Sequence, residues 1–272
     1  MKKLILFLGL ALLIPARASW AQLAAPGDSG VSMGHVHFLV PDVDAAKAFW
    51  TAMGGVPEKL GPNDVFKFPG VLILVRKGDG TTPTVGSVVG HIGFHVPDTA
   101  AAMAKWKAAG LNTEAGQNPG QGFVWTPDHL LRVEILEDKT QTVPIAFHHV
   151  HFYIADTAST SNVLEMQSWY AKMFGAKPGK RGQFDAADLP GVNLTFTKSD
   201  TPTVPTKGRM LDHIGFEIVG LEAFCKKAEA NGVKFDMPFT KRPDLGISLA
   251  FMTDPWGTYI ELNERPNPVY LP

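Results

Sequence analysis

Histidine recurs at one position in four similar segments of this 272-residue sequence. The segments read GHVHFLVPD, GHIGFHVPD, HHVHFYIAD and DHIGFEIVG, and they begin at residues 34, 90, 148 and 212. Two further segments, VWTPDHLLRVEI from residue 124 and FMTDPWGTYIEL from residue 251, each place a glutamate near their end. The repeated residues are His35, His91, His149, His213, Glu134 and Glu261. Each half of the chain therefore offers two imidazoles and one carboxylate at equivalent positions.

Two imidazoles and one carboxylate can hold a divalent ion on one face and leave coordination positions open for water or substrate. Grouped by halves, the residues predict one site of His149, His213 and Glu261 and another of His35, His91 and Glu134. Three nitrogen and oxygen ligands do not discriminate among Fe, Mn, Ni and Zn, so the metal stays open. The alternative is four surface or capping histidines and two ordinary strand glutamates.

Other polar side chains should share the ligands' faces, because side chains alternate along a strand. His151 follows His149, Glu217 follows His213, and Tyr259 precedes Glu261 at this spacing. We predict these three residues as proton-transfer groups of the second site. The first site would add His37, His95 and Arg132, and it is predicted to be a structural site, a second metal site or a degenerate copy.

The repeats also define the elements that must position these residues. The two halves run from about 31 to 140 and from about 146 to 265, and they meet near Lys139–Pro144. Each quarter reads β-α-β-β-β, with a strand rich in β-branched and aromatic residues followed by helical spacing of apolar residues. These predicted core positions include Ala46, Phe49, Trp50 and Met53 in the first quarter and Val163, Met166, Tyr170 and Met173 in the third. We predict helix N-caps at Asp42, Asp98 and Asp156, and helix ends at Gly110, Gly175 and Gly232. The predicted fold is α+β, with helices on one face of curved mixed sheets.

The N-terminus reads as an export signal. Lys2 and Lys3 precede an apolar run over residues 4–15, and Ser19-Trp20-Ala21 fits a signal-peptidase site. We predict a signal peptide over 1–21 cleaved after Ala21, a linker over 22–30 and a C-terminal tail over 266–272. The protein would be periplasmic or secreted, with an uncleaved membrane anchor as the alternative.

Composition limits the possible partners. Hydrophobic residues make up 45% of the chain and charged residues 19%, which indicates a globular protein. A net charge of −1 argues against nucleic acid as a partner. A single cysteine, Cys225, excludes an intramolecular disulfide. We expect a small-molecule substrate and, because the halves can pair within one chain, a monomer or weak homodimer.

The sequence resembles the vicinal oxygen chelate superfamily of glyoxalases, bleomycin resistance proteins and dioxygenases. The segments that carry this resemblance are the H-V-H-F and H-I-G-F strands, WYAKMFGA at 169–176 and DPWGTYIEL at 254–262. The resemblance implies four βαβββ modules in two tandem domains with cupped sheets, and a metal held inside the cups. It also implies ligand roles for His149, His213 and Glu261 and, in the first domain, for His35, His91 and Glu134.

Two departures from the family pattern affect the expected reaction. Glyoxalase-like members place a fourth ligand where this chain has Asn193 and Thr195 in one half and Leu72 and Leu74 in the other. Ring-cleaving dioxygenases have a tyrosine where Phe251 stands, and a histidine in the window that holds Arg242, Pro243 and Asp244. The resemblance thus implies a metal-dependent enzyme acting on vicinal oxygens, either dioxygenase-like or lyase/isomerase-like, and the N-terminal signal predicts that it is exported. Its alternatives are a non-catalytic sequestering protein of the bleomycin-resistance type and a structural protein with relic sites.

Overall fold

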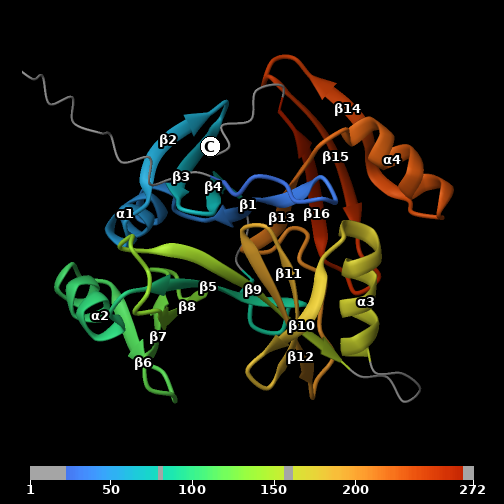
Figure 1. Cartoon of the computed structure of the whole chain (residues 1–272). Helices are drawn as coiled ribbons and strands as arrows, with labels where there is room; N and C mark the ends of the chain where they lie inside the picture. The colour runs from blue at the N-terminus through green and yellow to red at the C-terminus, as the bar shows by residue number, and fades with distance from the viewer. Residues whose placement is uncertain (1–22, 79–81, 156–161, 266–272) are drawn as a thin grey trace, which may run out of the picture.

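Two eight-stranded sheets make up the computed structural model (Figure 1). The structure describes residues 23–78, 82–155 and 162–265. The predicted signal peptide, the predicted cap Asp156 and the C-terminal tail lie outside these ranges. Among the described helices, none is both long and apolar enough to cross a membrane.

The predicted β-α-β-β-β order occurs four times. The first module consists of β1 (Val31–Val40), α1 (Val43–Met53), β2 (Val56–Leu60), β3 (Asn63–Phe68) and β4 (Val71–Lys77). The second consists of β5 (Val89–Val96), α2 (Thr99–Ala108), β6 (Asn112–Ala115), β7 (Gln121–Trp125) and β8 (Arg132–Glu137). The third consists of β9 (Ala146–Ala155), α3 (Asn162–Phe174), β10 (Lys177–Arg181), β11 (Phe184–Leu189) and β12 (Val192–Ser199). The fourth consists of β13 (Leu211–Ile218), α4 (Leu221–Ala230), β14 (Phe235–Arg242), β15 (Ile247–Thr253) and β16 (Tyr259–Glu264).

Each sheet joins one module from each half of the sequence. The order β14-β15-β16-β13-β1-β4-β3-β2 combines the first and fourth modules, and β10-β11-β12-β9-β5-β8-β7-β6 combines the second and third. The opening strands pair antiparallel, β1 with β13 and β5 with β9. We call these the outer-module sheet and the inner-module sheet. Neither half, 31–140 or 146–265, builds a sheet by itself.

Local sequence explains the helices. The side chains of Asp42 and Asp98 accept hydrogen bonds of 2.9 Å from the amides of Ala45 and Ala101, as N-caps do. The helix α4 begins at Gly220 without a side-chain cap. Gly110, Gly175 and Gly232 have positive φ, the backbone conformation that ends helices at glycine.

The helices bury their apolar stripes against the sheets. In α1 the predicted positions Ala46, Phe49, Trp50 and Met53 are all buried. In α3 Phe174 is buried while the predicted Met173 is only partly covered, since the buried row continues every fourth residue. Phe174 also contacts Phe216 of the outer-module sheet, with ring centroids 4.9 Å apart. One continuous hydrophobic core therefore supports both sheets and fixes both histidine clusters.

Candidate metal centres

The inner-module sheet brings His91, Glu134 and His149 together. Their strands β5, β8 and β9 are neighbours, and Gly93 pairs with both Glu134 and His149. Glu134 Oε2 lies 2.9 Å from His149 Nε2 and 3.3 Å from His91 Nε2. All three side chains are buried. We call this cluster, with His151, the inner centre.

The outer-module sheet builds the matching cluster from His35, His213 and Glu261, which we call the outer centre. Glu261 Oε2 lies 2.9 Å from His213 Nε2 and 3.2 Å from His35 Nε2. Here Gly215 pairs with both Glu261 and His35. All three side chains are again buried. The two centres thus have the same strand register around equivalent glycines, Gly93 and Gly215.

The missing side chain of each glycine leaves space for the imidazole of a candidate metal ligand. A Cβ built on Gly93 would lie 2.0 Å from His149 Cε1, and one on Gly215 would lie 2.1 Å from His35 Cε1. Real Cβ atoms do not approach other atoms so closely. The glycine of each H-I-G-F segment therefore lets an imidazole from the neighbouring strand cross the sheet face toward the glutamate.

The structure regroups the predicted ligands. All six residues lie in the two clusters, but His149 joins His91 and Glu134, while His35 joins His213 and Glu261. The grouping of His149 with His213 and Glu261, and of His35 with His91 and Glu134, is replaced because opening strands pair across the halves. Of the predicted proton-transfer residues, His151 belongs to the inner centre, and Glu217 and Tyr259 lie near the outer one.

His151 is the fourth member of the inner centre. Its Nδ1 lies 3.2 Å from His91 Nε2, and its Nε2 lies 2.6 Å from Thr197 Oγ1. The other oxygen of Glu134 accepts a short hydrogen bond from the Gln121 amide. The guanidinium of Arg181 lies 3.9 Å from Glu134 Oε2, while its Nε donates to Thr195 Oγ1 at 2.8 Å.

Burial keeps the inner imidazoles neutral. It lowers the pKa of His149 to about 3 and lowers the pKa of His91 and of His151 below the ordinary histidine value. For Glu134 burial acts in the opposite direction, yet contacts with His149 and His91 outweigh it and hold the pKa below its usual range. At neutral pH the centre thus presents neutral imidazoles and one carboxylate, the protonation states that metal binding requires.

Two further histidines, His148 and His95, lie behind His149 and support it. His149 Nδ1 lies 2.9 Å from His148 Nδ1, and the His148 ring stacks on His95 with centroids 3.8 Å apart. His95 in turn lies 3.7 Å from Asp138. His95 therefore supports His149 through His148. Such contacts orient a metal-binding imidazole.

The outer centre has a different set of supporting contacts. His213 Nδ1 donates to Asp212 Oδ1 at 2.5 Å, and the amide of Asn263 donates to Glu261 Oε1 at 2.7 Å. Burial alone would lower the pKa of His213, but hydrogen bonds to Asp212 and Glu261 raise it. A carboxylate on the far nitrogen of a histidine is a common arrangement behind metal ligands. His37 packs against the same ring, with centroids 4.7 Å apart.

Glu217 and Tyr259 lie on the ligand faces of β13 and β16, as alternation predicts. Glu217 is fully buried, and its contact is Arg265 Nη2 at 3.2 Å. Burial, opposed by Arg265 and reinforced by Glu261, raises the pKa of Glu217 to about 7. Tyr259 is partly exposed, stacks on Phe251 and carries the Lys207 ammonium 4.2 Å above its ring.

The walls of the two centres differ in polarity. Along β4, Leu72 and Leu74 pair with His35 and His37 and belong to a small apolar cluster with Leu23, Val65 and Leu60. Along β12, Asn193 and Thr195 pair with His149 and His151. The predicted fourth-ligand positions are therefore apolar at the outer centre and polar at the inner one.

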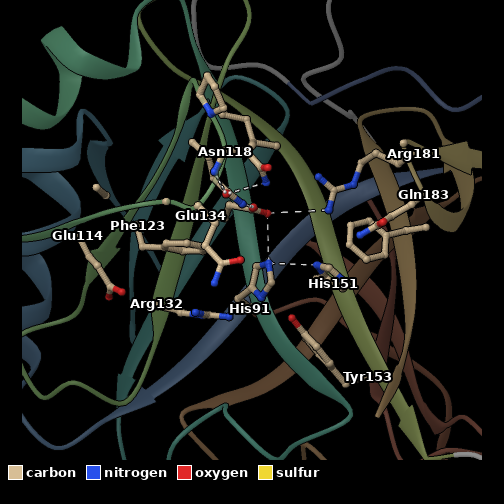
Figure 2. A pocket seen from close by; sticks show the side chains of 18 residues that line it. His91, Glu114, Asn118, Phe123, Arg132, Glu134, His151, Tyr153, Arg181 and Gln183 are labelled. Atoms are coloured by element: carbon tan, nitrogen blue, oxygen red, sulfur yellow. Dashed lines mark hydrogen bonds and ion pairs between the residues drawn. The ribbon is translucent and has the colours of Figure 1, made fainter. Parts of the chain in front are cut away.

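A cavity formed by described residues lies at the inner centre. The cavity measures about 670 Å³ and is lined by His91, Glu134, His151, Tyr153, Arg132 and Arg181, together with Phe123, Phe184 and several amide side chains. Figure 2 shows Glu134, His91 and His151 pointing into it from neighbouring strands. This volume lies in the range of small-molecule sites. Gln121 and Arg181 lie outside the repeated motifs, so the sequence analysis did not identify them.

The donor atoms fit a divalent cation. In each centre the candidate ligand atoms all lie within 4.8 Å of one another. Among the described residues, His149 Nε2 and both ring nitrogens of His35 are buried without a hydrogen-bond partner. His149 Nε2 lies at ion-pair distance from Glu134, and His35 Nε2 lies at ion-pair distance from Glu261. Buried ring nitrogens aimed at a carboxylate oxygen have the chemistry of a 2-His-1-carboxylate site.

Comparison with known proteins identifies the family of the second half of the chain. A family model described as Glyoxalase/Bleomycin resistance protein/Dioxygenase superfamily matches residues 146–262. These residues are a domain of that superfamily. The resemblance read from the sequence motifs is confirmed, and the matched residues run from β9 to β16.

Solved structures show the same fold over most of the chain. Glyoxalase I from Zea mays is 16% identical, with a TM-score of 0.66 over 86% of this chain and 92% of that one. A putative dioxygenase from Bacillus subtilis is 15% identical, with a TM-score of 0.62 over 91% of this chain and 87% of that one. No curated protein matches the sequence. At these identities the similarity shows the tandem superfamily fold, with its two mixed sheets, and no particular activity.

Proposed function

We propose that this superfamily member is a divalent-metal-dependent enzyme acting on a small molecule at the inner centre. One observation carries the proposal: the cavity of about 670 Å³ is lined by two of the three candidate ligands, His91 and Glu134, and by the polar residue His151. Catalytic metal sites keep coordination positions open, and the cavity gives a substrate access to them. The outer centre would bind a second ion.

When bound, the ion would supply Lewis-acid chemistry and orient two neighbouring substrate oxygens. Glu134, His91 and His149 would hold it. His151 is the best candidate to accept and return a proton, because it lines the cavity and its Nε2 is held by Thr197. Tyr153 stacks on His151, with centroids 4.8 Å apart, and fixes the plane of its ring. These residues favour proton transfer of the lyase or isomerase kind.

A dioxygenase reaction is the second candidate. Its support is the ligand set itself, since two histidines and one carboxylate on one face are typical of non-haem iron oxygenases. Oxygen consumption by the iron-loaded protein with catechols, against product formation from 2-oxoaldehydes without oxygen uptake, would separate the two reactions.

Metal analysis of the purified protein tests the proposal. After loading with Zn²⁺, Mn²⁺, Ni²⁺ or Fe²⁺ and removal of excess metal, we expect two ions per chain. His91→Ala should lose one ion, and the matched variant His213→Ala should lose the other. Less than one ion per chain, with stability unchanged in both variants, would refute the enzyme and favour a sequestering protein that needs no metal.

We also propose that the protein is exported and acts as a monomer or weak dimer. The charged start, apolar run and small residues before Gln22 support export. Intact mass of the protein recovered from a bacterial periplasm should correspond to a chain that begins at Gln22. Light scattering after size exclusion measures the oligomeric state.

A further inference from the structure

Two arginines from different modules line the cavity of the inner centre. Arg132 comes from β8, two residues before Glu134, and Arg181 ends β10 in the next module. Figure 2 shows them on opposite sides of the His91–Glu134 pair. Arginine stays charged at any pH that proteins tolerate, so these are permanent positive charges beside the centre.

Neither charge is neutralised by a carboxylate of its own. Within the described ranges, no carboxylate lies within ion-pair distance of Arg132, whose guanidinium instead lies 4.5 Å above the Phe123 ring. Arg181 has only Glu134, at 3.9 Å, and Glu134 already contacts His149, His91 and Gln121. A divalent ion would take the charge of Glu134 as well. Glu114, the other acid lining the cavity, is exposed and accepts from Trp125 Nε1 at 2.8 Å.

The outer centre lacks this charge at the same positions. The repeats align Arg132 with Tyr259, and the matching ends of β10 and β2 align Arg181 with Leu60. Leu60 packs on the apolar cluster of Leu72 and Leu74. Positive charge at these two aligned positions is therefore specific to the inner cavity. The cations beside the outer centre, Arg265 and Lys207, contact Glu217 and the Tyr259 ring.

We propose that the inner centre takes a small organic acid, a molecule whose vicinal oxygens face the candidate ligands and whose carboxylate is balanced by Arg132 and Arg181. This inference rests on the proposed function and names its substrate class. Guanidinium groups pair with planar carboxylates through two parallel hydrogen bonds. The Phe123 ring supports the Arg132 side chain, with the guanidinium carbon 4.5 Å from the ring centroid. The rings of Phe123, Phe184 and Tyr153 supply the apolar wall for the carbon skeleton.

Matched probes test the charge preference directly. We would titrate the Zn²⁺-loaded protein with 3,4-dihydroxybenzoate and with 3,4-dihydroxybenzamide, which share the vicinal hydroxyls and differ in one negative charge. We expect the benzoate to bind at least about tenfold more tightly, the size of one charge-assisted contact. Arg132→Met and Arg181→Met should each reduce that ratio toward one. Arg242→Met is the control, because Arg242 is exposed and paired with Asp244 at 2.7 Å.

The outcomes separate this inference from the proposed function. Equal binding of the two probes, with one zinc ion retained at the inner centre, would overturn the inference and leave the metalloenzyme standing. A charge preference that survives in a protein unable to bind metal would overturn the metalloenzyme and keep the anion site. Inorganic phosphate that competes more strongly than the benzoate would overturn the carboxylate assignment. Circular dichroism of each variant establishes that it is folded.

Discussion

Glu134→Gln should separate metal binding from fold stability at the inner centre. Glutamine has the shape of glutamate and can keep the existing contacts. Its oxygen can accept from Gln121, and its amide can donate to the neutral rings of His149 or His91. What it removes is the anionic ligand. The variant therefore tests whether the carboxylate is there for a cation.

Two magnitudes follow from these contacts. Exchanging hydrogen bonds of similar geometry should change the free energy of unfolding of the metal-free protein by no more than about 1 kcal/mol. An ion present at a hundredfold excess over its dissociation constant stabilises the wild type by about 2.7 kcal/mol. At about 2–4 °C per kcal/mol for a chain of this size, the ion at the inner centre should raise Tm by roughly 5–10 °C.

The assay is thermal unfolding with and without Zn²⁺, alongside metal content. Glu134→Gln should unfold near the wild-type temperature without metal, lose the inner-centre share of the metal-induced rise and bind one ion instead of two. Glu261→Gln is the matched variant and should lose only the outer-centre share. The reasoning fails if Glu134→Gln retains both ions. It also fails if its metal-free Tm falls by more than about 10 °C, because the carboxylate would then serve the fold itself.

Three further predictions test single features. Gly93→Ala should displace the His149 ring and weaken zinc binding at least tenfold at the inner centre only, as measured by competition with a chelator. Gly179→Ala is the control, because nothing lies within 4 Å of its Cβ position and its φ is not positive. His151→Gln should leave two ions per chain and lower turnover by about 10²–10⁴-fold, measured on whichever substrate the trials identify. Because burial raises the pKa of Glu217 to about 7, the folded chain binds this proton more tightly than the unfolded one, so its stabilising effect is full below about pH 4.5 and lost as the pH rises through 7. Between pH 5 and pH 8, this group should cost the metal-free wild type about 3 kcal/mol in free energy of unfolding, and Glu217→Gln should avoid that loss. Urea unfolding at both pH values measures it as the difference between wild type and variant, because the buried histidines of both proteins titrate with the opposite sign.

Repetition made the elements and the ligands predictable. A histidine or glutamate that occurs once has many explanations, whereas the set formed by His35, His91 and Glu134 occurs again at equivalent positions. The caps at Asp42 and Asp98 and the apolar stripe of α1 followed from rules that act within a few residues. These features need no knowledge of which distant strands meet.

The pairing of modules could not be predicted in the same way. An opening strand such as β1 offers a free edge that satisfies its hydrogen bonds equally well against β5 or β13, and the local sequence does not distinguish them. In the fold, β1 pairs with β13 and β5 pairs with β9, each across the two halves of the chain. A contact between residues so far apart leaves no periodic signal, so the halves suggested the wrong partners for His149 and His35.

The pairing of modules across the two halves explains how the repeats differ. The first half of the sequence contains both apolar wall residues, Leu72 and Leu74, and polar ones, Gln121 and Arg132, and their order along the chain does not explain the difference. Arranged by sheet, the differences become consistent. At the aligned positions, the outer centre has Leu72 and Leu74 on β4, Leu60 on β2 and Tyr259 on β16, whereas the inner centre has Asn193, Thr195, Arg181 and Arg132. Similarity between the repeats identifies the shared ligands, and the differences that follow the sheets identify the walls that select what each centre binds.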